Sequence, residues 1–163
     1  MTSEVLPVTF RNKSGHRLFG ILHRPAHPCA SGTAILLLSP GVKMRVAPHR
    51  LYLDMAERFV ALGYTVLRFD FYGLGDSEGD VHEEYLADLY GAVQVGRYIH
   101  DTIAAMDWMQ STHGTTKFIV SGLCGGAITG LLAAVKDPRI VGLLGLAIPV
   151  ILDGSRIDFN KYM

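Results

Sequence analysis

The chain has 163 residues, of which 49% are hydrophobic and 18% are charged, a composition that favours one folded domain and argues against disorder. Fifteen basic residues balance fifteen acidic ones, and the pI is near 7.1. This balance argues against nucleic-acid binding through a broad basic face, so we expect no nucleic-acid partner.

Signals for export, membrane insertion and metal binding are not found in the sequence. The chain does not start with a basic region followed by an apolar run, and its apolar stretches are shorter than the ~20 residues that span a bilayer. Cys29 and Cys124 lie far apart and form no Cys-x-x-Cys pair. We therefore expect a cytoplasmic protein with no membrane span, no metal and no organic cofactor.

The first part of the chain predicts a hairpin, a buried strand and a helix. Leu6 to Phe10 and Arg17 to His23 read as antiparallel strands around the turn at residues 12–15. The unbroken apolar run from Thr33 to Leu38 predicts a strand covered on both faces. A helix is expected from Pro48 to about Leu62, with one apolar stripe at Tyr52, Met55, Ala56, Phe59 and Val60.

The second part continues the alternation of strands and helices. The expected elements are a buried strand at Tyr64 to Phe69, a glycine-rich loop at Gly73 to Gly79, a helical stretch from Glu83 to Thr112 interrupted around Gly91 or Gly96, a short strand at Phe118 to Val120, a helix at Gly126 to Val135, and a buried strand at Ile140 to Ile148. This order predicts an α/β fold, with a mostly parallel sheet of about six strands and an antiparallel N-terminal hairpin.

The segment Gly122-Leu123-Cys124-Gly125-Gly126 joins a predicted strand to a predicted helix. In a nucleophile elbow this bend is sharp, and flanking glycines allow close chain approach while the central side chain is exposed at the sheet edge. The amino terminus of the following helix would stabilise negative charge on a thiolate at Cys124. We expect the N–H groups of Gly125 and Val42 to be the oxyanion donors. The alternative is that Cys124 is merely a small buried residue.

A second Gly-x-Ser-x-Gly pattern occurs at Gly75-Asp76-Ser77-Glu78-Gly79. Its serine lies inside a predicted loop, and no helix pattern begins after it, so the context does not suit a nucleophile. Ser77 is the less favoured candidate.

Together these segments resemble the α/β-hydrolase superfamily across almost the whole chain. Residues 68–77 are similar to the family's Asp-x-x-Gly-x-Gly-x-Ser segment, which implies structural roles for Asp76 and Ser77. Residues 41–45 with 48–52, residues 122–127 and residues 137–140 resemble the exosortase A system-associated hydrolases and neighbouring acyl-esterase-like groups. The superfamily also includes enzymes with cysteine in the elbow.

The resemblance also implies an acid and a histidine downstream of the nucleophile, and here the chain departs from the family. All seven histidines precede Cys124, and His113 is the last. We therefore expect residues 1–148 to be the amino-terminal half of a hydrolase core, and residues 149–163 to be the start of a cap or connecting segment. His49 is a weak alternative for the base.

A basic group, Arg45, His49 and Arg50 with Lys43, follows the third predicted strand and borders the expected site. It is a candidate for binding a carboxylate or phosphate of the substrate. A solvated loop at the start of a helix explains the same residues and is preferred.

The sequence thus favours a hydrolase of carboxylic esters or thioesters, incomplete in this chain, which acts on a small-molecule acyl substrate through Cys124. The alternative is a non-catalytic α/β-hydrolase-like protein used for binding or assembly. For this alternative, an open sheet edge after Ile140 to Ile148 would favour a homodimer.

Overall fold

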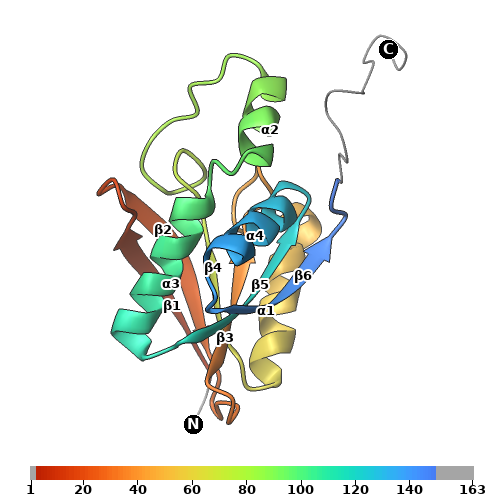
Figure 1. The fold of residues 1–163 in the computed structure, drawn as a ribbon. Coiled ribbons are helices and arrows are strands. Elements are labelled where there is room, and N and C mark those ends of the chain that lie inside the picture. Colours follow the sequence, from red (N-terminus) through yellow and green to blue (C-terminus); the bar gives the residue numbers. More distant parts are fainter. Residues whose placement is uncertain (1–2, 150–163) are drawn as a thin grey trace.

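The computed structural model describes residues 3–149, which form a twisted sheet with helices on both faces (Figure 1). The strands are β1 (Glu4–Arg11), β2 (Arg17–Arg24), β3 (Thr33–Leu38), β4 (Thr65–Phe69), β5 (Lys117–Leu123) and β6 (Ile140–Leu146). The helices are the 3-10 turn η1 (Pro48–Arg50), α1 (Leu51–Ala61), α2 (Leu86–Gln94), α3 (Ile99–His113) and α4 (Gly125–Lys136).

The strand order confirms the predicted architecture. The sheet has six strands in the order β1-β2-β4-β3-β5-β6. The pairs β1–β2 and β2–β4 are antiparallel, whereas β3–β4, β3–β5 and β5–β6 are parallel. The carboxyl ends of the parallel strands therefore meet at one edge, where ligands of open α/β sheets bind.

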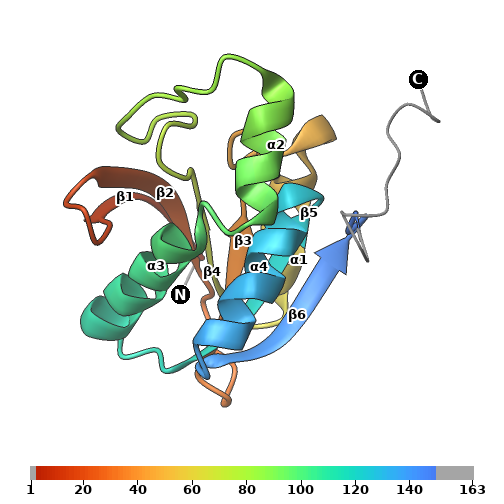
Figure 2. The same ribbon diagram turned by 45° about the horizontal axis from the view of Figure 1, so that its top comes forward.

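Two hydrophobic cores lie on opposite faces of the sheet, and β3 contributes to both. Leu36 and Leu38 belong to the core on the side of α3 and α4, and Ile35 and Leu37 to the core on the side of α1 (Figure 2). Side chains alternate across a strand, so a strand between two helical layers must be apolar throughout. All six residues of β3 are buried, as the unbroken run predicted.

The helix boundaries differ from the predicted ones where the backbone takes a positive φ. His49 and Arg50 have φ values of 54° and 61°, so a 3-10 turn precedes α1 and the regular helix begins at Leu51 rather than Pro48. The expected interruption after Glu83 falls at Gly96, whose φ is 97°. A side chain there would also collide with Ile99, because the added Cβ would lie 2.5 Å from Ile99 Cδ1.

The prediction that Ile140 to Ile148 is a buried strand is wrong. β6 ends at Leu146 and is an edge strand, with Val141 57% exposed and Leu144 42% exposed. Apolar sequence alone does not distinguish a central strand from an edge strand. The predicted cap or connecting segment, residues 149–163, falls almost entirely outside the described residues.

Within residues 3–149, none of the helices has the length and apolar character needed to cross a bilayer.

Candidate active site

Cys124 occupies a sharp bend between β5 and α4. Its backbone has φ 53° and ψ −115°, a conformation that costs a non-glycine residue of the order of 1–3 kcal/mol. The carbonyl of Cys124 accepts the first helical N–H groups, from Ala127 at 3.0 Å and Ile128 at 3.2 Å. Its own N–H donates to Leu146 O at 2.9 Å, which fixes the bend to the end of β6. The side chain is half-buried at the carboxyl edge of the sheet.

The glycines around Cys124 permit backbone contacts that a side chain would block. A Cβ at Gly122 would lie 2.3 Å from the carbonyl carbon of Gly126. A Cβ at Gly126 would lie 2.4 Å from Leu38 O, at the end of β3. Both distances are far below van der Waals contact and involve backbone atoms, so the bend requires glycine at these two positions.

The loop after β3 lies directly against the bend. A Cβ added to Gly125 would be 2.8 Å from the Cα of Gly41, whose φ is 63°. The buried side chain of Val93, on α2, is next to the same contact, at 3.0 Å from that added Cβ. The structure therefore brings together the loop and the elbow that were expected to form one site, with α2 beside them (Figure 2).

The two expected oxyanion donors differ in their present bonding. Gly125 is the first residue of α4, so its N–H has no acceptor within the helix. The N–H of Val42 donates to Pro40 O at 2.7 Å in a tight turn. The N–H of Gly125 is thus the more available of the two to bind an oxyanion. The N–H of Val42 would first have to give up its bond to Pro40 O.

Arg45 is held by two carboxylates. Its guanidinium pairs with the fully buried carboxylate of Asp70 and, at 2.7 Å, with Asp76. Its backbone N–H donates to Asp70 Oδ1 at 2.6 Å, and its guanidinium carbon lies 4.6 Å from the centre of the Phe19 ring. These contacts join the loop after β3 to the loop after β4. The positive charge of Arg45, a candidate for substrate binding, is therefore already paired with two carboxylates of the protein.

Comparison with known proteins agrees with this geometry. The family model Hydrolase_4, described as serine aminopeptidase S33, matches residues 32–158. The chain belongs to the Hydrolase_4 family of α/β-hydrolases.

Individual relatives of this hydrolase chain are about twice its length. It is 28% identical over 152 residues to the polyketide transferase grgF of Penicillium sp, covering 90% of this chain and 47% of the relative. It is 34% identical over 92 residues to the putative hydrolase YtaP of Bacillus subtilis, and the match covers 53% of this chain and 30% of the relative. The solved Pyrococcus furiosus esterase Pf2001 has a similar fold, with a TM-score of 0.74 at 20% identity over 92% of this chain and 51% of that chain.

In this hydrolase chain, Ser77 is bonded within the loop that contains it. Its hydroxyl donates to Asp70 O at 2.7 Å and accepts the N–H of Phe19 at 2.9 Å. These two bonds link the loop to β2. Asp76 likewise bonds through its N–H to Asp70 Oδ2 at 3.1 Å.

The other basic candidates of this chain lie on the surface. His49 and Arg50 are exposed in the 3-10 turn that precedes α1, and Lys43 is exposed in the loop after β3. They follow β3 as expected, but in the described residues they form no metal-binding group with other side chains.

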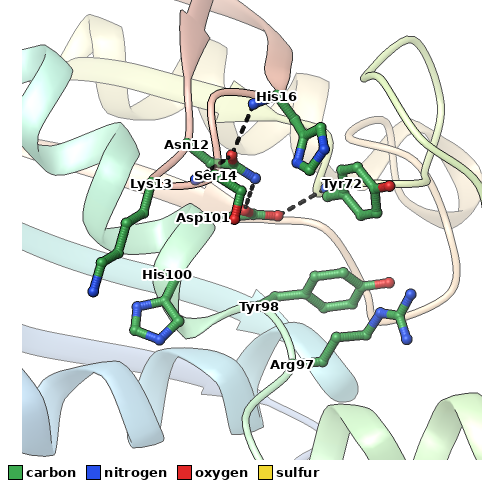
Figure 3. A pocket seen from close by; sticks show the side chains of 9 residues that line it. All are labelled: Asn12, Lys13, Ser14, His16, Tyr72, Arg97, Tyr98, His100 and Asp101. Atoms are coloured by element: carbon green, nitrogen blue, oxygen red, sulfur yellow. Dashed lines mark hydrogen bonds between the residues drawn. The ribbon is translucent and has the colours of Figure 1, made fainter.

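A polar cavity of about 290 Å³ lies away from the elbow, between the β1–β2 turn, the loop after β4 and the start of α3 (Figure 3). Its buried carboxylate, Asp101, accepts hydrogen bonds from Asn12 Nδ2 at 2.9 Å and from the N–H of Tyr72 at 2.8 Å. Burial nevertheless raises the pKa of Asp101, and the two hydrogen bonds only partly oppose this effect. Asp101 thus anchors three segments to one another. The lining residues are Asn12, Lys13, Ser14, His16, Tyr72, Arg97, Tyr98, His100 and Asp101.

The sequence did not reveal that the Tyr52 hydroxyl forms hydrogen bonds with the backbone at Leu38 O and at the N–H of Leu123. This side chain was assigned to the apolar stripe of its helix, and it is indeed fully buried. The signal that could have revealed more is the hydroxyl itself, because a buried tyrosine hydroxyl usually has a hydrogen-bond partner. Nothing in the spacing indicates which partner it has.

Proposed function

We propose that this chain carries the nucleophile of an α/β-hydrolase that cleaves carboxylic ester or thioester bonds, with Cys124 as the attacking residue. The observation that carries the proposal is the strained backbone of Cys124 between β5 and α4, with glycines at both flanking positions in backbone contact. Such strain persists only where the surrounding structure enforces it, and it concentrates at functional sites.

In the proposed reaction the Cys124 thiolate attacks the carbonyl carbon of the substrate. The new S–C bond places negative charge on the carbonyl oxygen, which the N–H groups of Gly125 and Val42 stabilise. The intermediate collapses as the bond to the alcohol or thiol breaks, and the leaving group departs with the electron pair. The product is an acyl group on Sγ, which water then hydrolyses or another nucleophile accepts.

The second half of this reaction needs a base to activate water. We propose that a histidine and an acid from outside residues 3–149 provide it, as the resemblance to the family implies. The substrate class rests on the relatives: an esterase and a polyketide transferase are both proteins with this fold. The narrower likeness to the exosortase A system-associated hydrolases remains part of the proposal. The relatives do not favour the non-catalytic alternative.

Stoichiometric acylation tests the proposal. Incubation with p-nitrophenyl butyrate is expected to release one nitrophenolate per chain and to add one butyryl group at Cys124, detected by mass spectrometry of peptides. Cys29 is the internal control, because it is also half-buried but lies in a loop before β3. Cys124→Ala is expected to abolish the adduct.

Repeated turnover by the isolated chain is expected to be close to zero. Equal acylation of Cys29 and Cys124, or none at Cys124, would contradict the role of the thiol. Robust turnover that Cys124→Ala abolishes would instead refute the claim that the base comes from elsewhere.

A further inference from the structure

Tyr52 lies in the first turn of α1 and places its hydroxyl between two strands of the sheet. The hydroxyl donates to Leu38 O at 2.7 Å, and it accepts the N–H of Leu123 at 2.7 Å. Tyr52 has no exposed surface. Both hydrogen-bond partners of the hydroxyl are backbone groups, so the side chain of Tyr52 links the main chain at Leu38 to the main chain at Leu123.

The two bonded groups are the last residues of β3 and β5. The register of this parallel pair ends at Leu38 opposite Gly122, so Tyr52 bridges the strands where their ladder stops. Directly after Leu38 comes the loop Ser39 to Val42, and directly after Leu123 comes Cys124. The Tyr52 hydroxyl is therefore bonded to the backbone directly before each of the two segments of the candidate site, the loop after β3 and the elbow at Cys124.

Burial keeps this bridge in its neutral form. Loss of solvation raises the pKa of Tyr52 well above 10, and the nearby Cys124 acts in the same direction, although the N–H of Leu123 partly opposes the shift. The hydroxyl proton therefore remains available for Leu38 O throughout the pH range in which a thiolate would react.

We propose that Tyr52 is a positioning residue that sets the separation between the Cys124 nucleophile and the oxyanion loop that follows β3. The inference rests on the proposed function, because it assigns the two segments their chemical roles. Without the hydroxyl, Leu38 O and the N–H of Leu123 would lose their common partner, and the elbow and the loop would no longer be fixed to each other at this point.

The test compares Tyr52→Phe with Tyr64→Phe. The first variant keeps the buried ring and removes only the bridge, whereas Tyr64 packs partly buried against the same core beside α1 and provides a matched loss of one hydroxyl. In Tyr52→Phe, acylation of Cys124 by p-nitrophenyl butyrate is expected to slow about tenfold, because it depends on aligned oxyanion donors. Alkylation by iodoacetamide, which develops no oxyanion, is expected to change less than about twofold.

Amide hydrogen exchange provides a readout independent of the chemistry. Tyr52→Phe is expected to accelerate exchange in residues 39–42 and 122–125, and Tyr64→Phe is not. Unchanged exchange there, or a parallel fall in acylation and alkylation, would overturn the positioning role. Failure of the wild-type chain to acylate Cys124 would overturn the proposed function, while the exchange experiment would still decide whether Tyr52 fixes the two segments.

Discussion

His23 and Arg68 meet inside the protein, where β2 pairs with β4. Arg68 Nε donates to His23 Nε2 at 2.9 Å, and both residues are buried. This bond requires a neutral imidazole, because a protonated ring has no free lone pair to accept with. Burial, and secondarily the positive charge of Arg68, lower the pKa of His23 to about 4.

This pair predicts loss of stability in mild acid. An unfolded chain binds a proton at His23 below a pH of about 6.5, while the folded chain does so only near 4, so folding becomes less favourable as pH falls between these values. The slope of the free energy of unfolding is expected to approach about 1.4 kcal/mol per pH unit. Urea unfolding at several pH values measures it.

The matched variants are His23→Gln and His113→Gln. Glutamine at position 23 retains an acceptor for Arg68 but does not titrate, so the profile should flatten between about pH 4 and 6.5. His113 is more exposed, and burial lowers its pKa in the same direction, so its replacement should flatten the profile less. An unchanged profile in His23→Gln would contradict the assignment.

Two helix glycines, Gly126 in α4 and Gly91 in α2, differ in how much space a side chain would find around them. In α4, a Cβ at Gly126 would meet Leu38 O at 2.4 Å and Ser39 O at 2.7 Å. In α2, a Cβ at Gly91 would meet nothing within 4 Å. The first position is constrained by packing of the helix against the end of β3, and the second is free.

Substitution by alanine is therefore expected to have opposite effects at the two positions. Gly126→Ala should destabilise the chain by about 3 kcal/mol or more, because two backbone segments would have to separate. Gly91→Ala should be neutral or stabilise it by about 0.5–1 kcal/mol through helix propensity. Thermal and urea unfolding of both variants measure the difference, and a stable Gly126→Ala chain would show that the elbow does not need this contact.

The elements also show what sequence could and could not reveal. The run from Thr33 to Leu38 predicted β3 with its observed bounds, because this strand is covered on both faces and every one of its residues is buried. Gly122 and Gly126 indicated the elbow through their spacing around Cys124. The positive φ of His49 and the carboxylates around Arg45 depend on contacts between distant segments, which spacing does not encode.

At the scale of the whole molecule, β6 is one of the two edge strands of the sheet that residues 3–149 form. Residues 140–149 contain no charged side chain, and Val141 and Leu144 are substantially exposed. Edge strands of stable monomers are usually protected by charge, proline or a covering element. We propose that two copies of this chain associate through β6.

Light scattering during size-exclusion chromatography tests the association. The chain is expected to show a concentration-dependent dimer, and Val141→Lys should shift it to monomer by placing a charge on the edge strand. Val95→Lys is the matched control, since Val95 is 85% exposed but lies just after α2. A monomer at every concentration, or equal effects of both variants, would contradict pairing at β6.

The bond from the N–H of Cys124 to Leu146 O places the end of β6 beside the backbone of Cys124. Neighbouring strands in a sheet lie about 4.8 Å apart, so a polypeptide aligned alongside β6 in the same direction would lie about two such spacings from β5, the strand that leads into Cys124. A side chain that followed this run would lie on the same side of the sheet edge as the proposed nucleophile. The edge of β6 is therefore a position from which a paired polypeptide, whether the second copy proposed above or another segment, would reach the proposed nucleophile.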